Sequence, residues 1–224
     1  GKTGVVWVKT EGFNQKNTMV ISFVRWVMVR KKGPTDVSFK TIVPKLKNVL
    51  AASELSIPES LNFDSYNKVL SGSSYVLNDY QIGEIIDHAD GVTVTESEHV
   101  MATRLWQNNA KVHFDTTARS DGRRLIYGGH VISMARALSY NGLANMQIIA
   151  AINGGSHANP CFAGDTIYAW SEVLDSAQTR ISSIGAIRLR LVATKGAVGL
   201  LRDENNKYYD DVFLDLDYWA FVPV

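Results

Sequence analysis

The sequence predicts an α+β protein in which an antiparallel β-sheet wraps around one apolar helix. The stretch 127–142 has almost no polar face, which is typical of a buried helix. Alternating or β-branched runs follow it along the second half of the chain, as expected for antiparallel strands. We therefore expect strands at 146–153, 165–174, 181–194 and 208–222.

A β-rich pair of segments opens the chain. Residues 4–10 and 18–30 are rich in β-branched and aromatic side chains, and Gly12 and Asn14 mark a turn between them. A hairpin alone is only marginally stable in water, so it must pack on something else. Residues 31–80 then form a Ser-rich connection in which Gly33-Pro34 argues against regular structure.

Regular structure resumes after Gly83. We expect a short strand at 92–94. Thr95-Glu96-Ser97-Glu98 has the spacing of a capping box and predicts the start of a helix that runs through Trp106. Gln107-Asn108-Asn109 ends that helix, and a polar loop follows before the central helix begins.

The central helix at 127–142 has glycines at both ends. Gly142 is expected to take the left-handed conformation that stops a helix. Gly128 and Gly129 leave the first backbone N–H groups accessible, and these groups carry the positive end of the helix dipole. Such amides are suited to polarising a carbonyl oxygen. A core helix with a glycine turn is the alternative, and this stretch alone favours it.

The composition excludes several classes of function. Lys and Arg number 23 against 22 Asp and Glu, so there is no electrostatic footprint for nucleic acid. No apolar run reaches membrane-spanning length. Cys161 is the single cysteine, which fits a reducing compartment, and we expect a cytoplasmic protein. The chain starts at Gly1 with no signal peptide, which suggests a processed or truncated product.

Two stretches carry a resemblance to a known family. Tyr127-Gly128-Gly129-His130 opens an apolar helix, and 159–169 contains Pro160 followed by Gly164-Asp165-Thr166. Both are similar to the MaoC-like hydratases, which are hot-dog enzymes. Longer blocks resemble the branch of that family that acts on mesaconyl-CoA. These blocks are 1–6, 25–31, 107–108, 112–114 and 164–172.

The resemblance implies a hot-dog fold and a domain organisation. In this branch, two hot-dog units lie in one chain. Residues 1–32 then resemble the last strands of a truncated first unit, 33–82 the linker, and 83–224 a complete second unit. The resemblance also implies a homodimer, in which a second copy could replace the missing unit.

The resemblance implies catalytic residues as well. Asn108 and His113 match the family's Asp and His that handle water, and Gly129 N–H matches the amide that polarises the thioester. His113 is the best general acid/base, because a His has a pKa near neutrality; a structural His in a loop is the alternative. Asn108 departs from the family, since an amide takes up no proton. Asp115 is a conceivable substitute carboxylate, because two residues past His113 on an extended chain it would share a face with that histidine. A solvated loop Asp is the more usual role.

The remaining candidates are assigned to substrate binding or to structure. Substrate-binding residues are expected at Tyr127, Gly128, His130 and Asp115. His157 has the position of a strand-end residue, and His88 and His99 have no partner that the sequence names. No metal-ligand spacing is present, and the resemblance implies no cofactor, because CoA is part of the substrate.

The predicted function is therefore that of a hydro-lyase on a short branched enoyl-CoA such as mesaconyl-CoA, or on β-methylmalyl-CoA in the reverse direction. A hot-dog acyl-CoA thioesterase is one alternative. Such enzymes usually carry a carboxylate on the central helix, whereas residues 130–140 of this chain contain no Asp or Glu, which counts against it. A truncated acyl-CoA-binding protein without catalytic activity is the other.

Overall fold

A computed structural model describes residues 3–33 and 40–224 of the chain. By compactness the chain divides into two units, Gly1–Lys47 and Asn48–Val224. The predicted division at 32 and 82 stays a prediction. Gly1 and Lys2 of the first resembling block, and Pro34 of the predicted connection, lie outside the described residues.

The first unit is a β-hairpin. Strands β1 (Thr3–Phe13) and β2 (Met19–Arg30) pair antiparallel, with Trp7 opposite Trp26. The turn is closed by Asn14, whose side-chain oxygen accepts hydrogen bonds from two backbone N–H groups of the loop. Many apolar side chains of both strands are exposed, so the hairpin has no core of its own. The two strands predicted here are confirmed.

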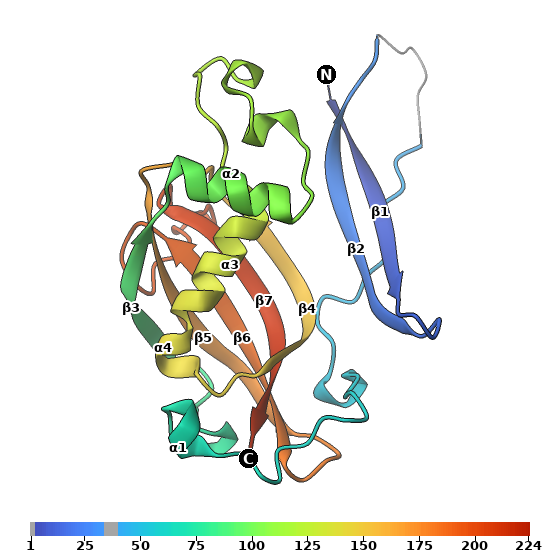
Figure 1. Cartoon of the computed structure of the whole chain (residues 1–224), viewed down its shortest axis with the longest axis vertical. Coiled ribbons are helices and arrows are strands. Elements are labelled where there is room, and N and C mark those ends of the chain that lie inside the picture. The colour runs from blue at the N-terminus through green and yellow to red at the C-terminus, as the bar shows by residue number, and fades with distance from the viewer. Residues whose placement is uncertain (1–2, 34–39) are drawn as a thin grey trace. The chain divides into compact units, whose positions relative to one another are not determined.

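The second unit is built on an antiparallel sheet whose strand order is β3-β5-β6-β7-β4 (Figure 1). Its middle strands form a meander, whereas β3 and β4 occupy the two edges. The strands are β3 (Ile85–Thr93), β4 (Ile148–His157), β5 (Thr166–Gln178), β6 (Ile184–Thr194) and β7 (Val212–Pro223). Gly154-Gly155 lies inside β4, where the sequence suggested a strand end.

One helix, α3 (Gly128–Leu138), lies against a face of this sheet and contacts four of its strands. Val131 and Ala135 are buried at this interface, while Ala137 is exposed. The predicted helix is therefore buried on the side that faces the sheet, and part of its surface is exposed. The helix also ends earlier than expected, and Gly142, with φ of +95°, interrupts the following turn α4 (Tyr140–Leu143). The left-handed glycine is confirmed.

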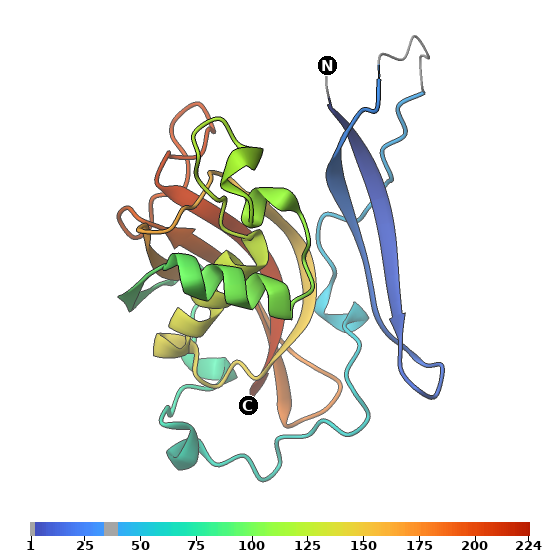
Figure 2. The same ribbon diagram turned by 45° about the horizontal axis from the view of Figure 1, so that its top comes forward.

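A second helix, α2 (Glu96–Leu105), crosses the N-terminal end of α3 (Figure 2). Thr95 caps it by accepting a hydrogen bond from the N–H of Glu98, whose side chain reaches back to Thr95, so the predicted capping box is confirmed. The remaining helical segments are short. They are η1 (Ala52–Glu54), α1 (Lys68–Ser71), η2 (Leu77–Asp79), η3 (Lys111–His113) and η4 (Thr116–Ala118).

The segment that precedes β3 belongs to the core of the second unit. Leu77 and Tyr80 are buried in the main cluster between sheet and helix, and Leu55 and Ile57 pack in a second cluster with Trp219. The architecture thus confirms an antiparallel sheet wrapped around one helix. Across residues 3–33 and 40–224, no helix has the length and apolar character needed to cross a bilayer.

Candidate active site

A cavity of 310 Å³ lies at the N-terminal end of α3. The segment after α2 contributes His113, the start of α3 contributes Gly128, and the end of β4 contributes His157. Apolar walls come from the buried side chains of Val131 and Phe213. A mostly apolar cavity with a few convergent polar groups is the usual form of a small-molecule site.

His113 ends the short helix η3 and is 8% exposed. Its Nδ1 lies 2.8 Å from the carbonyl oxygen of Leu125, which can only accept, so Nδ1 carries the proton. In the neutral ring, Nε2 then holds a lone pair, and no hydrogen bond to it is present among the described residues. The ring packs edge-on against Tyr127, with centroids 5.5 Å apart. The imidazole is thus oriented, with one nitrogen free for chemistry.

The first amides of α3 are also available. Tyr127 is the N-cap residue and makes no side-chain capping bond. Within residues 3–33 and 40–224, the N–H groups of Gly128 and Gly129 have no hydrogen-bond partner. A side chain at Gly129 would meet the ring of Tyr127, at 2.5 Å from Cε1. The end of the helix therefore presents two bare N–H groups and the positive end of its dipole.

His99, on α2, holds the entry to this helix in place. The N–H of Tyr127 donates to His99 Nε2 over 3.0 Å. Burial, with smaller contributions from His113 and His130, lowers the pKa of His99 to about 4. The ring is therefore neutral near pH 7, with its proton on Nδ1. No partner for His99 could be named from the sequence, and in the structure it is the N–H of Tyr127.

His130 points away from the cavity and towards α2. It is buried beside Trp106 and His99, with ring centroids 5.9 and 6.1 Å away. Its Nε2 lies 3.5 Å from Glu98 Oε1, and neither ring nitrogen makes a hydrogen bond within the described chain. Burial lowers the pKa of His130, and Glu98 partly opposes that shift.

Asn108 and Asp115 both stabilise local turns. The side-chain oxygen of Asn108 accepts from the N–H of Ala110. Asp115 caps η4, and the hydroxyl and N–H of Thr117 lower the pKa of its carboxyl group. Because both flanking segments are helical turns, His113 and Asp115 do not share one face of an extended strand. Asn108, Asp115, Tyr127, Gly129 and His130 are not among the described residues that line the cavity.

The sequence underestimated His157, which it placed at a strand end with no role in the site. It does end β4, but its ring lies against the α-carbon of Gly128, where a Cβ would clash with Nε2. A histidine two residues after a Gly-Gly pair was a weak signal, because the contact joins segments far apart in the sequence. His88, by contrast, is structural, since it bonds Asn141 O and Ser171 Oγ.

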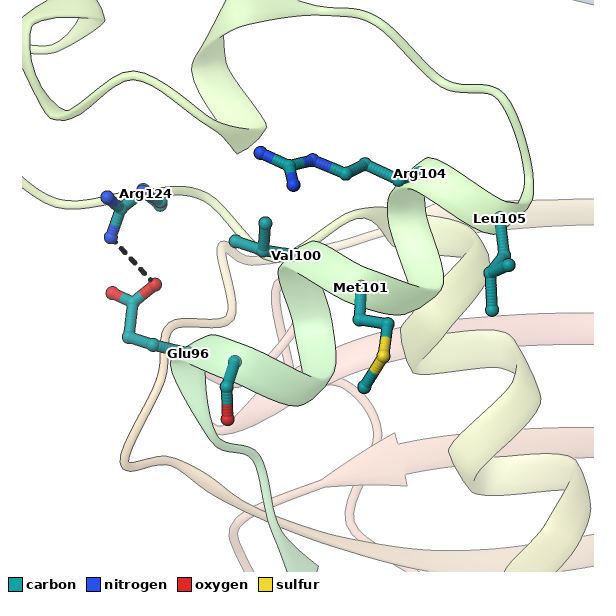
Figure 3. A pocket seen from close by; sticks show the side chains of 7 residues that line it. Glu96, Val100, Met101, Arg104, Leu105 and Arg124 are labelled. Atoms are coloured by element: carbon teal, nitrogen blue, oxygen red, sulfur yellow. Dashed lines mark hydrogen bonds and ion pairs between the residues drawn. The ribbon is translucent and has the colours of Figure 1, made fainter.

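A larger hollow of 730 Å³ lies on the outer side of α2 (Figure 3). Met101 and Leu105 form its apolar part, and Arg124 bonds Glu96 across one end at 3.1 Å. It contains no histidine and no free helix terminus, so the smaller cavity is the better candidate for chemistry. Among the described residues, no three His, Cys, Asp or Glu side chains are grouped so that they could hold a metal ion.

No family model matches the chain. Two curated proteins are similar over its full length. One is the mesaconyl-CoA hydratase of Cereibacter sphaeroides, 60% identical over 225 residues that make up 66% of that protein. The other is the β-methylmalyl-CoA dehydratase of Chloroflexus aurantiacus, 49% identical over 230 residues that make up 65% of it. The chain thus spans about two thirds of the length of these relatives.

Two solved structures are similar in fold. The crystal structure of a MaoC-domain dehydratase from Chloroflexus aurantiacus superposes with a TM-score of 0.93 at 48% identity, covering 99% of this chain and 65% of that one. The double hot-dog protein Rv0216 from Mycobacterium tuberculosis superposes with a TM-score of 0.65 at 19% identity, covering 99% and 63%. The second likeness supports the fold alone. From the sequence identity and the superposition together, the chain belongs to the MaoC-like hydratases of the hot-dog fold.

Proposed function

We propose that this protein is a hydro-lyase that adds water to a short branched enoyl-CoA, or removes it from the hydroxyacyl-CoA. The single observation that carries the proposal is the cavity at the start of α3. There the oriented imidazole of His113 and Gly128, whose amide is bare, line one small, mostly apolar site, and Gly129 is the next residue of the helix. The names of the two relatives suggest mesaconyl-CoA and β-methylmalyl-CoA as the substrate pair.

In the proposed reaction, His113 acts as general acid and base. Its free Nε2 takes a proton from water as the water oxygen bonds to the β-carbon of the enoyl group. The electron pair of the double bond moves to the α-carbon and the thioester oxygen. The protonated ring then returns its proton to the α-carbon, so that one water is added overall. A positioned acid/base group contributes about 10²–10⁴ in rate.

The helix end stabilises the charge that develops on the thioester oxygen. We propose that the N–H of Gly129 donates to that oxygen, with the dipole of α3 adding to its effect. The N–H has no competing acceptor in the described chain, so it does not have to break a bond first. This chemistry uses hydrogen bonds and proton transfer, and it requires neither a metal nor an organic cofactor.

Asn108, Asp115, Tyr127 and His130 have supporting roles in this proposal. Asn108 and Asp115 form the turns on either side of His113 and so set the position of its ring. Tyr127 packs against that ring, and His130 supports the same aromatic cluster from behind. A second copy of the chain as partner and a cytoplasmic location remain predictions from the sequence.

The test is the absorbance of the enoyl thioester when mesaconyl-CoA is mixed with the protein. We expect the absorbance to fall as water adds, and His113→Gln to reduce kcat/KM by about 10²–10⁴. His88→Gln is the matched control, because His88 is buried and hydrogen-bonded but lies outside the cavity lining. Thermal melting of each variant checks that it is folded.

Three results would contradict the proposal. Release of free CoA, detected with a thiol reagent, would identify a thioesterase. Binding of mesaconyl-CoA without any change in absorbance would identify a binding protein. Equal activity of His113→Gln and the wild type would remove His113 from its role as acid/base.

A further inference from the structure

His157 is a polar group of the cavity that the proposed reaction does not use. Its ring lines the cavity together with His113 and Gly128. Within residues 3–33 and 40–224, neither ring nitrogen has a hydrogen bond or an ion pair. The other polar side chains of the lining are occupied or inert. Asn159 donates both amide hydrogens to backbone oxygens, and burial raises the pKa of the Cys161 thiol to about 12.

We propose that His157 binds the free carboxylate of a dicarboxylic acyl thioester and so selects such substrates over neutral acyl chains. The proposal rests on the proposed function, because it names the substrate class of the same site. The acyl groups in the names of both relatives carry a second carboxylate, which must be accommodated in a cavity of 310 Å³. An anion in an apolar cavity needs a donor or a cation as a partner.

His157 is the group best placed to be that partner. No Lys or Arg is present among the described residues that line the cavity, so an imidazole is its candidate cation. The ring of His157 lies against Gly128, the first residue of α3. A carboxylate there would receive a hydrogen bond from His157 and would also lie close to the positive end of the helix dipole.

The backbone holds His157 in position before any ligand binds. His157 pairs with Leu214 on β7, and the next residue, Ala158, donates its N–H to Phe213 O over 3.0 Å. The side chain of Asn159 then bonds the carbonyl groups of Tyr209 and Val212, at 2.9 and 2.8 Å. These bonds fix the end of β4, so the imidazole needs little reorganisation on binding.

The pKa of the His157 imidazole is also consistent with this role. Desolvation lowers the pKa of His157, and no acidic group in residues 3–33 and 40–224 opposes that shift. A bound carboxylate would raise the pKa again, because an opposite charge favours the protonated ring. The described part of the chain therefore gives His157 no counter-ion, and the substrate can supply one.

The test compares two saturated acyl thioesters that differ in one group. Calorimetry measures binding of 2-methylsuccinyl-CoA, which has the carboxylate, and of 2-methylbutanoyl-CoA, which has a methyl group in its place. We expect the wild type to prefer the carboxylate by about tenfold to a hundredfold, as for a hydrogen bond to a charged group. His157→Leu should abolish the preference, so that the two thioesters bind equally, and His157→Gln, which keeps a donor, should retain part of it.

Binding is measured without turnover, so this test is independent of the hydro-lyase proposal. A carboxylate preference that depends on His157 supports the inference even if no hydration is detected. Equal binding of the two thioesters by the wild type overturns it. It is also overturned if His157→Leu loses hydration of mesaconyl-CoA and of neutral 2-methylbut-2-enoyl-CoA to the same extent, because His157 would then act on the reaction and not on the carboxylate.

Discussion

His99 should make the protein less stable as the pH falls below neutrality. The ring is 0% exposed, and its Nε2 accepts the N–H of Tyr127, a bond that requires an unprotonated nitrogen. His113 and His130 face it from the neighbouring segments, and Arg124 adds a further unfavourable charge. Glu96 acts in the opposite direction and favours the protonated ring, but its effect is smaller than that of burial.

The magnitude follows from the shift of the pKa from 6.5 to about 4. As the pH falls through 6.5, the unfolded chain binds a proton at His99 while the folded protein does not, so the free energy of unfolding decreases. The loss continues until the pH reaches about 4, where the folded protein binds the proton as well. Each pKa unit is worth about 1.4 kcal/mol, so His99 alone costs about 3 kcal/mol over this interval.

The assay is urea denaturation followed by tryptophan fluorescence between about pH 8 and pH 4, applied to the wild type and to His99→Gln. The glutamine side-chain oxygen can still accept the N–H of Tyr127, but it does not titrate. We expect the variant to lose about 3 kcal/mol less than the wild type on acidification. His157→Gln is the control, because the side chain of His157 is exposed and accepts no hydrogen bond from the described backbone.

Identical losses in the wild type and His99→Gln would refute this reasoning. Such a result would mean that the folded protein accommodates a proton on His99, for example by releasing the N–H of Tyr127. The buried ring would then have a pKa close to its ordinary value, and the contact between α2 and the start of α3 would be weaker than the structure indicates.

Two further predictions concern glycines. Gly129→Ala and Gly129→Pro both add a Cβ beside Tyr127, but only the proline removes the N–H. In a hydration assay, Gly129→Pro should therefore lower kcat by about 10²–10³ more than Gly129→Ala does. Equal activities of the two variants would exclude the N–H from catalysis. Gly142→Ala should cost more stability than Gly164→Ala in urea titrations. Both have a left-handed backbone, but only at Gly142 would the Cβ meet a neighbour, Ile86 Cγ2 at 2.7 Å, which adds about 1–3 kcal/mol. Equal losses would mean that Ile86 moves aside freely.

Features with local causes could be predicted from the sequence. The capping box at Thr95 and the left-handed Gly142 each depend on a few neighbouring residues, and both are present in the structure. The strands of the meander follow from side chains that alternate between two faces. The candidate His113 came from a resemblance to a family, and the structure places it at the cavity, although its role stays a prediction.

The predictions from the sequence were wrong where a local pattern was used to infer the three-dimensional surroundings of a residue. The apolar stretch at 127–142 suggested a buried helix, but the sheet covers one face of α3 and Ala137 is exposed. Asp115 was expected to share a face with His113, yet helical turns on both sides direct the two residues into separate roles.

The sequence by itself determined the fold class, the order of most elements and the family, because these follow from hydrophobic periodicity, capping residues and extended blocks of similarity. Only the tertiary structure decided which histidines meet the helix end. The N–H of Tyr127 finds His99 on α2, and Gly128 meets His157 because β4 pairs with β7 at the edge of the sheet. The physical reason is that these contacts join segments distant in sequence, and strand order and register bring them together.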